Sequence, residues 1–258
     1  MNVVYHGSSR IGLKVIEPHK STHGTYVYAT PNKFLALHFS KRCGDDLTYE
    51  IGRVNKTEPF DLVENVPGAF KKMYANSSSI YTLSADTFKD IHTGFEEVVS
   101  LDAVKVLSEE HYDDLYSAIK KAEEDCLVRI YLYPNKPSYF KQDGTHILDK
   151  LRYYKKTSMK EFNKIHFDRL VCLHPELLDE INKLAKEFNL DCFYTPEDLI
   201  YLFKQRIESQ LNNLDNEQFI DCSYISICFS YPFLKNDIDK LYYDYLERYH
   251  KLIGDQRV

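Results

Sequence analysis

Tryptophan is absent from this chain of 258 residues, and no apolar run approaches the ~20 consecutive residues that a membrane-spanning helix requires. The first residues, Met-Asn-Val-Val-Tyr-His, contain neither the basic nor the apolar segment of a secretory signal peptide. The lack of tryptophan points to no function. The other two absences predict a cytoplasmic protein without membrane contact.

Motifs for metal binding are also lacking. The six cysteines form no Cys-x-x-Cys pair and show no zinc-like spacing, which predicts reduced and mostly buried thiols. The ten histidines include no His-Glu-x-x-His pattern, so we expect no metal site. A net charge of −6 argues against a broad positive surface for duplex DNA.

The common nucleotide-binding motifs are missing as well. No Gly-x-Gly-x-x-Gly follows a predicted strand, and there is no Gly-Lys-Ser/Thr of a phosphate-binding loop. A Rossmann-type dehydrogenase or a P-loop ATPase would be expected to contain one of them. The sequence therefore disfavours both classes of enzyme.

The first half of the chain has the pattern of a β-rich domain. Short apolar runs alternate with Gly, Pro, Asn and Ser, which is typical of strands separated by turns. Thr30, as an N-cap before Pro31, predicts a short helix that contains Phe34 to Phe39, and a second helix is expected over Glu109 to Glu124. The predicted strands are Val3–Tyr5, Tyr26–Ala29, Leu47–Ile51, Pro59–Val63, Ile80–Leu83, Val98–Leu101, Val104–Leu107 and Leu127–Tyr133.

The second half has long helical periodicity. The sequence predicts helices over Ile147–Phe162, Pro175–Phe188, Pro196–Leu214 and Lys235–Ile253. Phe219–Phe233 is apolar without a clear period, so it is compatible with a buried helix or a strand. We therefore expect an α+β protein, with one domain over residues 1–135 and a helical domain over residues 136–258.

Three short segments of the first half carry residues suited to chemistry. His6-Gly7-Ser8 follows the first predicted strand, which Gly7 is expected to end while letting a backbone or ligand come close. The segment 24–40 reads as a strand, a turn and a helix. The segment 95–106 begins on the paired carboxylates Glu96 and Glu97. Taken singly, each segment is more typical of core or solvated surface than of a site.

In this order the three segments resemble the ADP-ribosyltransferase superfamily, in the branch with His, Tyr and Glu on successive core strands. That branch includes diphtheria-toxin-like enzymes and poly(ADP-ribose) polymerases, whose first motif also reads His-Gly-Ser or His-Gly-Thr. The second segment is similar to rifampin ADP-ribosyltransferases, and the matching residues here are Val27, Tyr28, Thr30 and Ala36. The third matches the polymerase strand at Glu97, Asp102 and Val106. The resemblance covers roughly the first half of the chain, and it implies a split β-sheet domain that uses NAD as a co-substrate.

The resemblance also implies residue roles. Glu97 would bond the 2′-hydroxyl of the nicotinamide ribose and stabilise the ribosyl cation that forms when the glycosidic bond breaks. His6 would bond the adenosine-side ribose, and the backbone of Gly7 would pair with the carboxamide. Tyr28 would stack on the nicotinamide ring. The polar side chains of Ser8 and Thr30 would support the site.

Two choices remain open at this level. Tyr26 and Tyr28 lie on the same face of a strand, so both can line the cleft, and the Val-Tyr-x-Thr match favours Tyr28. Glu96 and Glu97 point to opposite faces, so only one of them can face the cleft. A second aromatic residue at the site would be Phe34, His38 or Phe39, of which we include Phe39.

The sequence thus predicts an NAD-dependent ADP-ribosyltransferase whose acceptor is a protein, a nucleic acid, a small molecule or water. An RNA 2′-phosphotransferase, which also uses NAD, is disfavoured by Glu97 and by the acidic charge balance. The alternative from another class is an inactive transferase-like module that binds partners through its helical half. The sequence does not indicate an oligomeric state.

Overall fold

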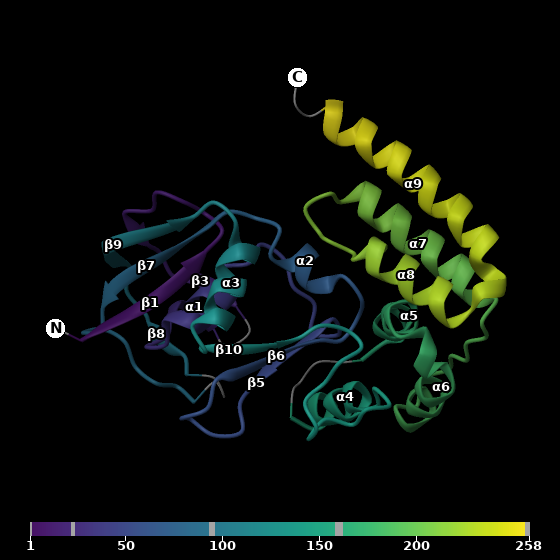
Figure 1. Cartoon of the computed structure of the whole chain (residues 1–258), viewed down its shortest axis with the longest axis horizontal. Helices are drawn as coiled ribbons and strands as arrows, with labels where there is room; N and C mark the ends of the chain where they lie inside the picture. Colours follow the sequence, from purple (N-terminus) through teal and green to yellow (C-terminus); the bar gives the residue numbers. More distant parts are fainter. Residues whose placement is uncertain (1, 22–23, 93–95, 158–161, 256–258) are drawn as a thin grey trace. The chain divides into compact units, whose positions relative to one another are not determined.

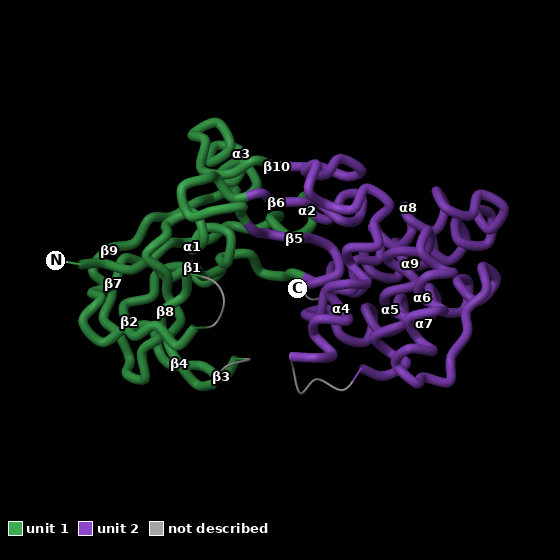
Figure 2. The backbone as a smooth tube through the Cα atoms, turned by 90° about the horizontal axis from the view of Figure 1, so that it is seen from below, with its two compact units in different colours: residues 1–44, 53–60, 70–129 green, residues 45–52, 61–69, 130–258 purple. Residues whose placement is uncertain are grey.

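The structure is a computed structural model that describes residues 2–21, 24–92, 96–157 and 162–255. Its chain forms two compact units that alternate along the sequence (Figure 2). The first unit contains residues 1–44, 53–60 and 70–129, and the second contains residues 45–52, 61–69 and 130–258. The predicted domain boundary after residue 135 stays a prediction.

The architecture is α+β, with β-sheets in the N-terminal part and a mostly helical C-terminal part, as the sequence predicted (Figure 1). Every strand predicted from the sequence is present, because the short apolar runs at those positions supply side chains that a sheet can bury. Two short strands were not predicted, and neither were the helices α2 (Ala69–Met73) and α5 (Lys164–Leu173).

Two sheets form the first unit. One has four strands in the order β1-β7-β9-β2 and the other has three in the order β3-β4-β8. All their pairings are antiparallel. Val4, Val27, Tyr81 and Leu83, which come from both sheets, are almost fully buried in one cluster. The strands are β1 (Val3–Ser8), β2 (Val15–Ile16), β3 (His19–Ser21), β4 (Gly24–Ala29), β7 (Ser78–Ser84), β8 (Val98–Ser100) and β9 (Val104–Tyr112).

The expectation that Gly7 ends the first strand is wrong, because β1 continues to Ser8 and Gly7 pairs with Ile80 of β7. The close approach of another backbone is confirmed. A Cβ atom at Gly7 would lie 1.8 Å from the carbonyl oxygen of Ala36 in helix α1 (Lys33–Phe39). Gly7 is therefore the position at which α1 rests on β1.

The N-cap of α1 is Asn32 rather than the expected Thr30. The Asn32 side chain accepts a hydrogen bond from the Leu35 amide at 3.2 Å. Thr30 is instead held in an extended conformation, because its amide and carbonyl both bond to Tyr5 of β1 at 2.9 and 2.8 Å. The same two bonds join the two sheets of the first unit.

The predicted helix over Glu109 to Glu124 begins later than expected. The strand β9 continues through Tyr112, with Glu110 opposite Ile80 and Tyr112 opposite Ser78. The helix α3 spans Leu115–Glu124 and has Asp114 as its N-cap. Pairing with β7 therefore overrides the helical pattern of these four residues, which is an effect of tertiary structure on local preference.

The second unit holds most of a three-stranded sheet and a set of helices. The sheet has the order β10-β6-β5, and Phe219–Phe233, which the sequence left open, contains a helix. None of the helices in the described part of the chain has the length and apolar character to cross a membrane. The strands are β5 (Tyr49–Gly52), β6 (Phe60–Glu64) and β10 (Val128–Tyr131), and the further helices are α4 (His146–Thr157), α6 (Leu178–Glu187), α7 (Asp198–Asn212), α8 (Ile220–Ser230) and α9 (Lys235–Asp255).

Candidate functional site

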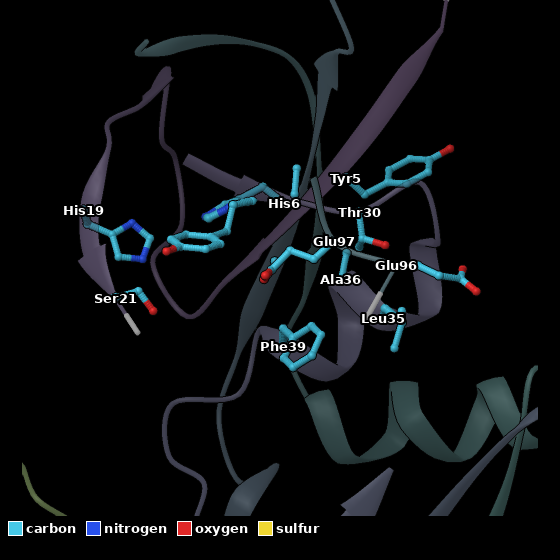
Figure 3. Close-up of a pocket in the computed structure, with 13 residues that line it drawn as sticks. Tyr5, His6, His19, Ser21, Thr30, Leu35, Ala36, Phe39, Glu96 and Glu97 are labelled. Carbon is cyan, nitrogen blue, oxygen red and sulfur yellow. The ribbon is translucent and has the colours of Figure 1, made fainter. Parts of the chain in front are cut away.

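A pocket of about 290 Å³ opens in the first unit (Figure 3). It lies where β1, β3, β4 and α1 meet the segment before β8, which here means residues 96–97. Most of the residues that the sequence singled out line it. They are His6, Gly7, Tyr28, Thr30, Phe39 and Glu97. The pocket therefore gathers groups that lie up to about 90 positions apart in the sequence.

Strand register explains this convergence. Tyr5 pairs with Thr30, which places His6 of β1 beside the end of β4. On the other edge of β4, Val98 of β8 pairs with Ala29, so Glu97 also comes to the end of β4. The three segments thus meet at Thr30, although nothing local in their sequences brings them together.

Two predicted residues do not line the pocket. Ser8 is the last residue of β1, and its hydroxyl accepts a hydrogen bond from the Arg10 amide at 3.1 Å. The ring of Tyr26 meets the ring of Tyr28 edge-on, with 5.9 Å between the ring centroids. Tyr26 therefore packs against the Tyr28 ring and helps to hold it in place.

His6 is a half-buried side chain whose tautomer is set by one hydrogen bond. Its Nδ1 donates to the carbonyl oxygen of Tyr28 at 2.7 Å, so the proton of the neutral ring lies on Nδ1 and Nε2 remains an acceptor. Burial lowers the pKa of His6 below its usual value, the bond to Tyr28 opposes this, and the nearby His19 lowers it further. At neutral pH His6 is therefore uncharged and can accept a hydrogen bond from a hydroxyl group.

Tyr28 presents a fixed aromatic ring to the pocket. Its hydroxyl donates to the Gly24 carbonyl oxygen at 3.2 Å. The ring of His19 lies against it, with 5.6 Å between centroids and a tilt of 54°. Held by contacts from two strands, the Tyr28 ring needs little ordering when a flat group stacks on it.

The adjacent carboxylates Glu96 and Glu97 point in opposite directions. In Figure 3 the side chain of Glu97 extends into the space between His6 and Phe39, whereas Glu96 points away from them. The Glu96 carboxylate forms an ion pair with Arg53 and accepts a hydrogen bond from Asn32. Both residues line the pocket, and Glu97 is the one whose carboxylate extends toward His6 and Phe39.

The three aromatic candidates on α1 have different surroundings. Phe39 lines the pocket and is 39% exposed. Phe34 is buried against Phe60, with 5.6 Å between ring centroids. His38 is fully buried, its Nδ1 lies 2.7 Å from the Tyr74 hydroxyl, and burial lowers its pKa well below the usual value. Only Phe39 can therefore contact a molecule in the pocket.

His19 and Ser21, which line the pocket from β3, were not predicted from the sequence. All three residues of β3 are exposed, and a strand this short has no apolar alternation. Its pairing with β4, in which Ser21 lies opposite Gly24, is therefore visible only in the structure.

A second arrangement in the first unit superficially resembles a Ser-His-Asp triad. The Ser79 hydroxyl lies 3.2 Å from His111 Nδ1, and His111 Nε2 lies 3.1 Å from Asp113. However, Ser79 is fully buried and donates its proton to Glu109 at 2.8 Å. Ser79 is therefore a structural hydroxyl and cannot attack a substrate. Among the described residues, no group of three or more His, Cys, Asp or Glu side chains is arranged to hold a metal ion.

Comparison with known proteins finds no match, either to a protein-family model, to a curated protein or to a solved structure. The function must therefore be argued from the pocket itself. Its useful features are an acceptor nitrogen on His6, a fixed ring on Tyr28 and a carboxylate on Glu97.

Proposed function

We propose that this protein is an NAD-dependent ADP-ribosyltransferase, which cleaves the bond between nicotinamide and ribose and transfers ADP-ribose to an acceptor. NAD is the co-substrate, and the first unit is the split-sheet transferase domain. The observation that carries the proposal is the meeting of His6, Tyr28 and Glu97 in one pocket. These are the residues of the His-Tyr-Glu pattern, and they come from three different segments.

The chemistry requires negative charge beside a developing cation. When the glycosidic bond of NAD breaks, positive charge grows on the ribose ring. A carboxylate fixed in a partly enclosed pocket stabilises that charge more strongly than it would in water. Glu97 fills this role, and its carboxylate can also accept a hydrogen bond from a ribose hydroxyl and orient the acceptor.

The backbone of Gly7 fits the carboxamide of nicotinamide. In an antiparallel ladder, the backbone groups of successive residues face alternate edges of the strand. Tyr5 directs its N–H and C=O to Thr30, on the edge opposite β7, so Gly7 two residues later faces that same edge. One donor and one acceptor are thus presented beside the pocket, which complements the C=O and NH₂ of a carboxamide.

The remaining groups suit other parts of the dinucleotide. A cationic nicotinamide ring is attracted to the face of an aromatic ring, which Tyr28 supplies with Phe39 nearby. Nε2 of neutral His6 can accept a ribose hydroxyl. A volume of about 290 Å³ lies at the lower end for small-molecule pockets. The pocket therefore accommodates the nicotinamide end of NAD, while the rest extends past its mouth.

The test is release of nicotinamide from NAD by the purified protein, with and without a cell lysate that supplies acceptors. E97Q keeps the shape of the side chain but removes its charge, and we expect it to lower kcat by about 100-fold or more without changing the melting temperature. E124Q is a matched control, since Glu124 lies on α3, is 69% exposed and is remote from the pocket lining.

The outcomes separate the proposal from its alternatives. Activity in the wild type and E124Q but not in E97Q supports NAD cleavage, and labelled NAD then identifies the acceptor. No release from the wild type, with or without lysate, refutes the proposal. In that case, stabilisation of the protein by NAD would favour an inactive binding module, because a ligand at about 100 times its Kd adds about 2.7 kcal/mol to the free energy of unfolding.

A further inference from the structure

Arg53 belongs to the first unit and directly follows β5, which belongs to the second. Its guanidinium forms an ion pair with Glu96 and lies 4.6 Å from the centroid of the Phe60 ring. The Arg53 side chain is 16% exposed, and that of Glu96 is 27% exposed. The pair is therefore better shielded from solvent than ordinary surface ion pairs, whose contribution is small.

Glu96 connects three segments of the first unit. One carboxylate oxygen pairs with Arg53, and the other accepts a hydrogen bond from Asn32 Nδ2 at 3.5 Å. Asn32 in turn caps α1 through the Leu35 amide. Glu96 thus ties the segment before β8 both to residue 53 and to the start of the helix that carries Phe39 into the pocket.

This anchoring decides which carboxylate extends toward His6 and Phe39, since both residues line the pocket. Glu96 and Glu97 are neighbours in the chain, and their side chains point in opposite directions (Figure 3). If the segment turned over, the two side chains would exchange their directions. The alternation of side chains along a strand would permit either arrangement, because both residues are glutamate. Arg53 and Asn32 bind Glu96 on one side and so commit Glu97 to the other. Arg53 also neutralises the carboxylate next to Glu97, which removes a like-charge repulsion.

We propose that Arg53 is a positioning residue, which acts through Glu96 to hold residues 96–97 so that the Glu97 carboxylate extends toward His6 and Phe39. The effect on the segment follows from the contacts of Arg53 and Glu96 alone. The effect on catalysis rests on the proposed NAD cleavage. Arg53 itself does not line the pocket, so it is not assigned a contact with substrate.

The experiment compares R53A, R53K, E96Q and a control, R129A, in the full chain. Arg129 suits the control because it also pairs with a glutamate of the first unit, Glu58 at 3.2 Å, and does not line the pocket. Two properties are measured. One is hydrogen exchange of the amides over residues 96–100, where the Val99 amide donates to the Lys89 carbonyl oxygen at 2.9 Å. The other is kcat and KM for nicotinamide release.

We expect R53A to accelerate exchange over residues 96–100 while leaving β7 and β9 unchanged. Its kcat should fall by about 10- to 100-fold, with KM for NAD changed by less than about threefold. A misplaced Glu97 carboxylate stabilises the transition state less well, whereas binding of the substrate depends on it much less. R53K keeps the charge and should lie between wild type and R53A. E96Q should resemble R53A, and R129A should resemble the wild type in both measurements.

The proposal is overturned if hydrogen exchange over residues 96–100 is the same in R53A and R53K as in the wild type. It is likewise overturned if the wild type releases nicotinamide and R53A does so with the same kcat. It is also overturned if E96Q loses all activity while R53A loses none, since Glu96 would then act directly. If the wild type releases no nicotinamide, the proposed function fails, and the exchange measurement still decides whether Arg53 positions this segment. R53K serves the comparison if R53A does not fold.

Discussion

Replacing Gly7 by alanine tests the packing on which the whole pocket depends. The new Cβ atom would lie 1.8 Å from the Ala36 carbonyl oxygen, 2.8 Å from the Ala36 carbonyl carbon and 3.0 Å from the Ser40 amide nitrogen. All three atoms are backbone, so no side chain can rotate away. To restore even a 3.0 Å contact with the carbonyl oxygen, α1 and β1 must separate by at least 1.2 Å.

Both stability and activity should respond to this shift. Overpacking of this kind typically costs about 1–3 kcal/mol. For a chain of this size we expect a melting temperature lower by roughly 2–12 °C, at about 2–4 °C per kcal/mol. The shift also moves Phe39 relative to His6, and a misplacement of about 1 Å can lower activity about 100-fold. We therefore expect G7A to release nicotinamide about 100-fold more slowly than the wild type.

Gly52 provides the matched control. It is the last residue of β5, and a Cβ atom there would meet nothing within 4 Å. G52A should therefore change the free energy of unfolding by less than about 0.5 kcal/mol. The assays are urea denaturation, thermal melting and nicotinamide release. If G7A matches G52A in all three, α1 does not rest on Gly7 as described, and the reasoning is refuted.

Two further predictions concern histidine titration and the aromatic wall. Burial and the nearby Lys136, His174 and Lys150 lower the pKa of His146 to about 4, so the unfolded state binds more protons than the folded state between about pH 6.5 and 4. The free energy of unfolding should fall as the pH drops through this window, by about 1–2 kcal/mol from His146 because solvent screens a partly exposed side chain. Urea denaturation should show a flatter pH profile in H146Q, and equal slopes would contradict the prediction. Y28A should raise KM for NAD by about 3- to 30-fold through the loss of stacking, whereas Y28F should bind NAD normally, and equal binding by both variants would exclude stacking on Tyr28.

Much of the local structure could be predicted from the sequence. The strands of the first half were found because they are short apolar runs between turn residues, and the long helices of the second half because their apolar residues recur with helical spacing. The prediction was wrong at Glu109–Tyr112, where pairing with β7 extends a strand into a helical pattern. It also missed β2 and β3, which are too short to carry a period.

His6, Gly7, Tyr28, Thr30, Phe39 and Glu97 were predicted as site residues from their types and order, and all of them line the pocket. Their assignment to NAD chemistry stays a prediction. The spacing match favoured Glu97 over Glu96, and both residues line the pocket. Strand alternation alone could not decide which carboxylate extends toward His6 and Phe39, because Glu96 and Glu97 are chemically identical and differ only in what surrounds them. Arg53 and Asn32 supply that difference, and both are distant from Glu96 in the sequence.

The sequence by itself determined most of the strands and long helices and the chemical groups available for a site, since those follow from side-chain type and local spacing. Only the tertiary structure decided where β1, β4 and β8 meet, that Gly7 carries a helix rather than ending a strand, and that His19 joins the pocket. These features depend on contacts between segments far apart in the chain, and no local pattern encodes such contacts.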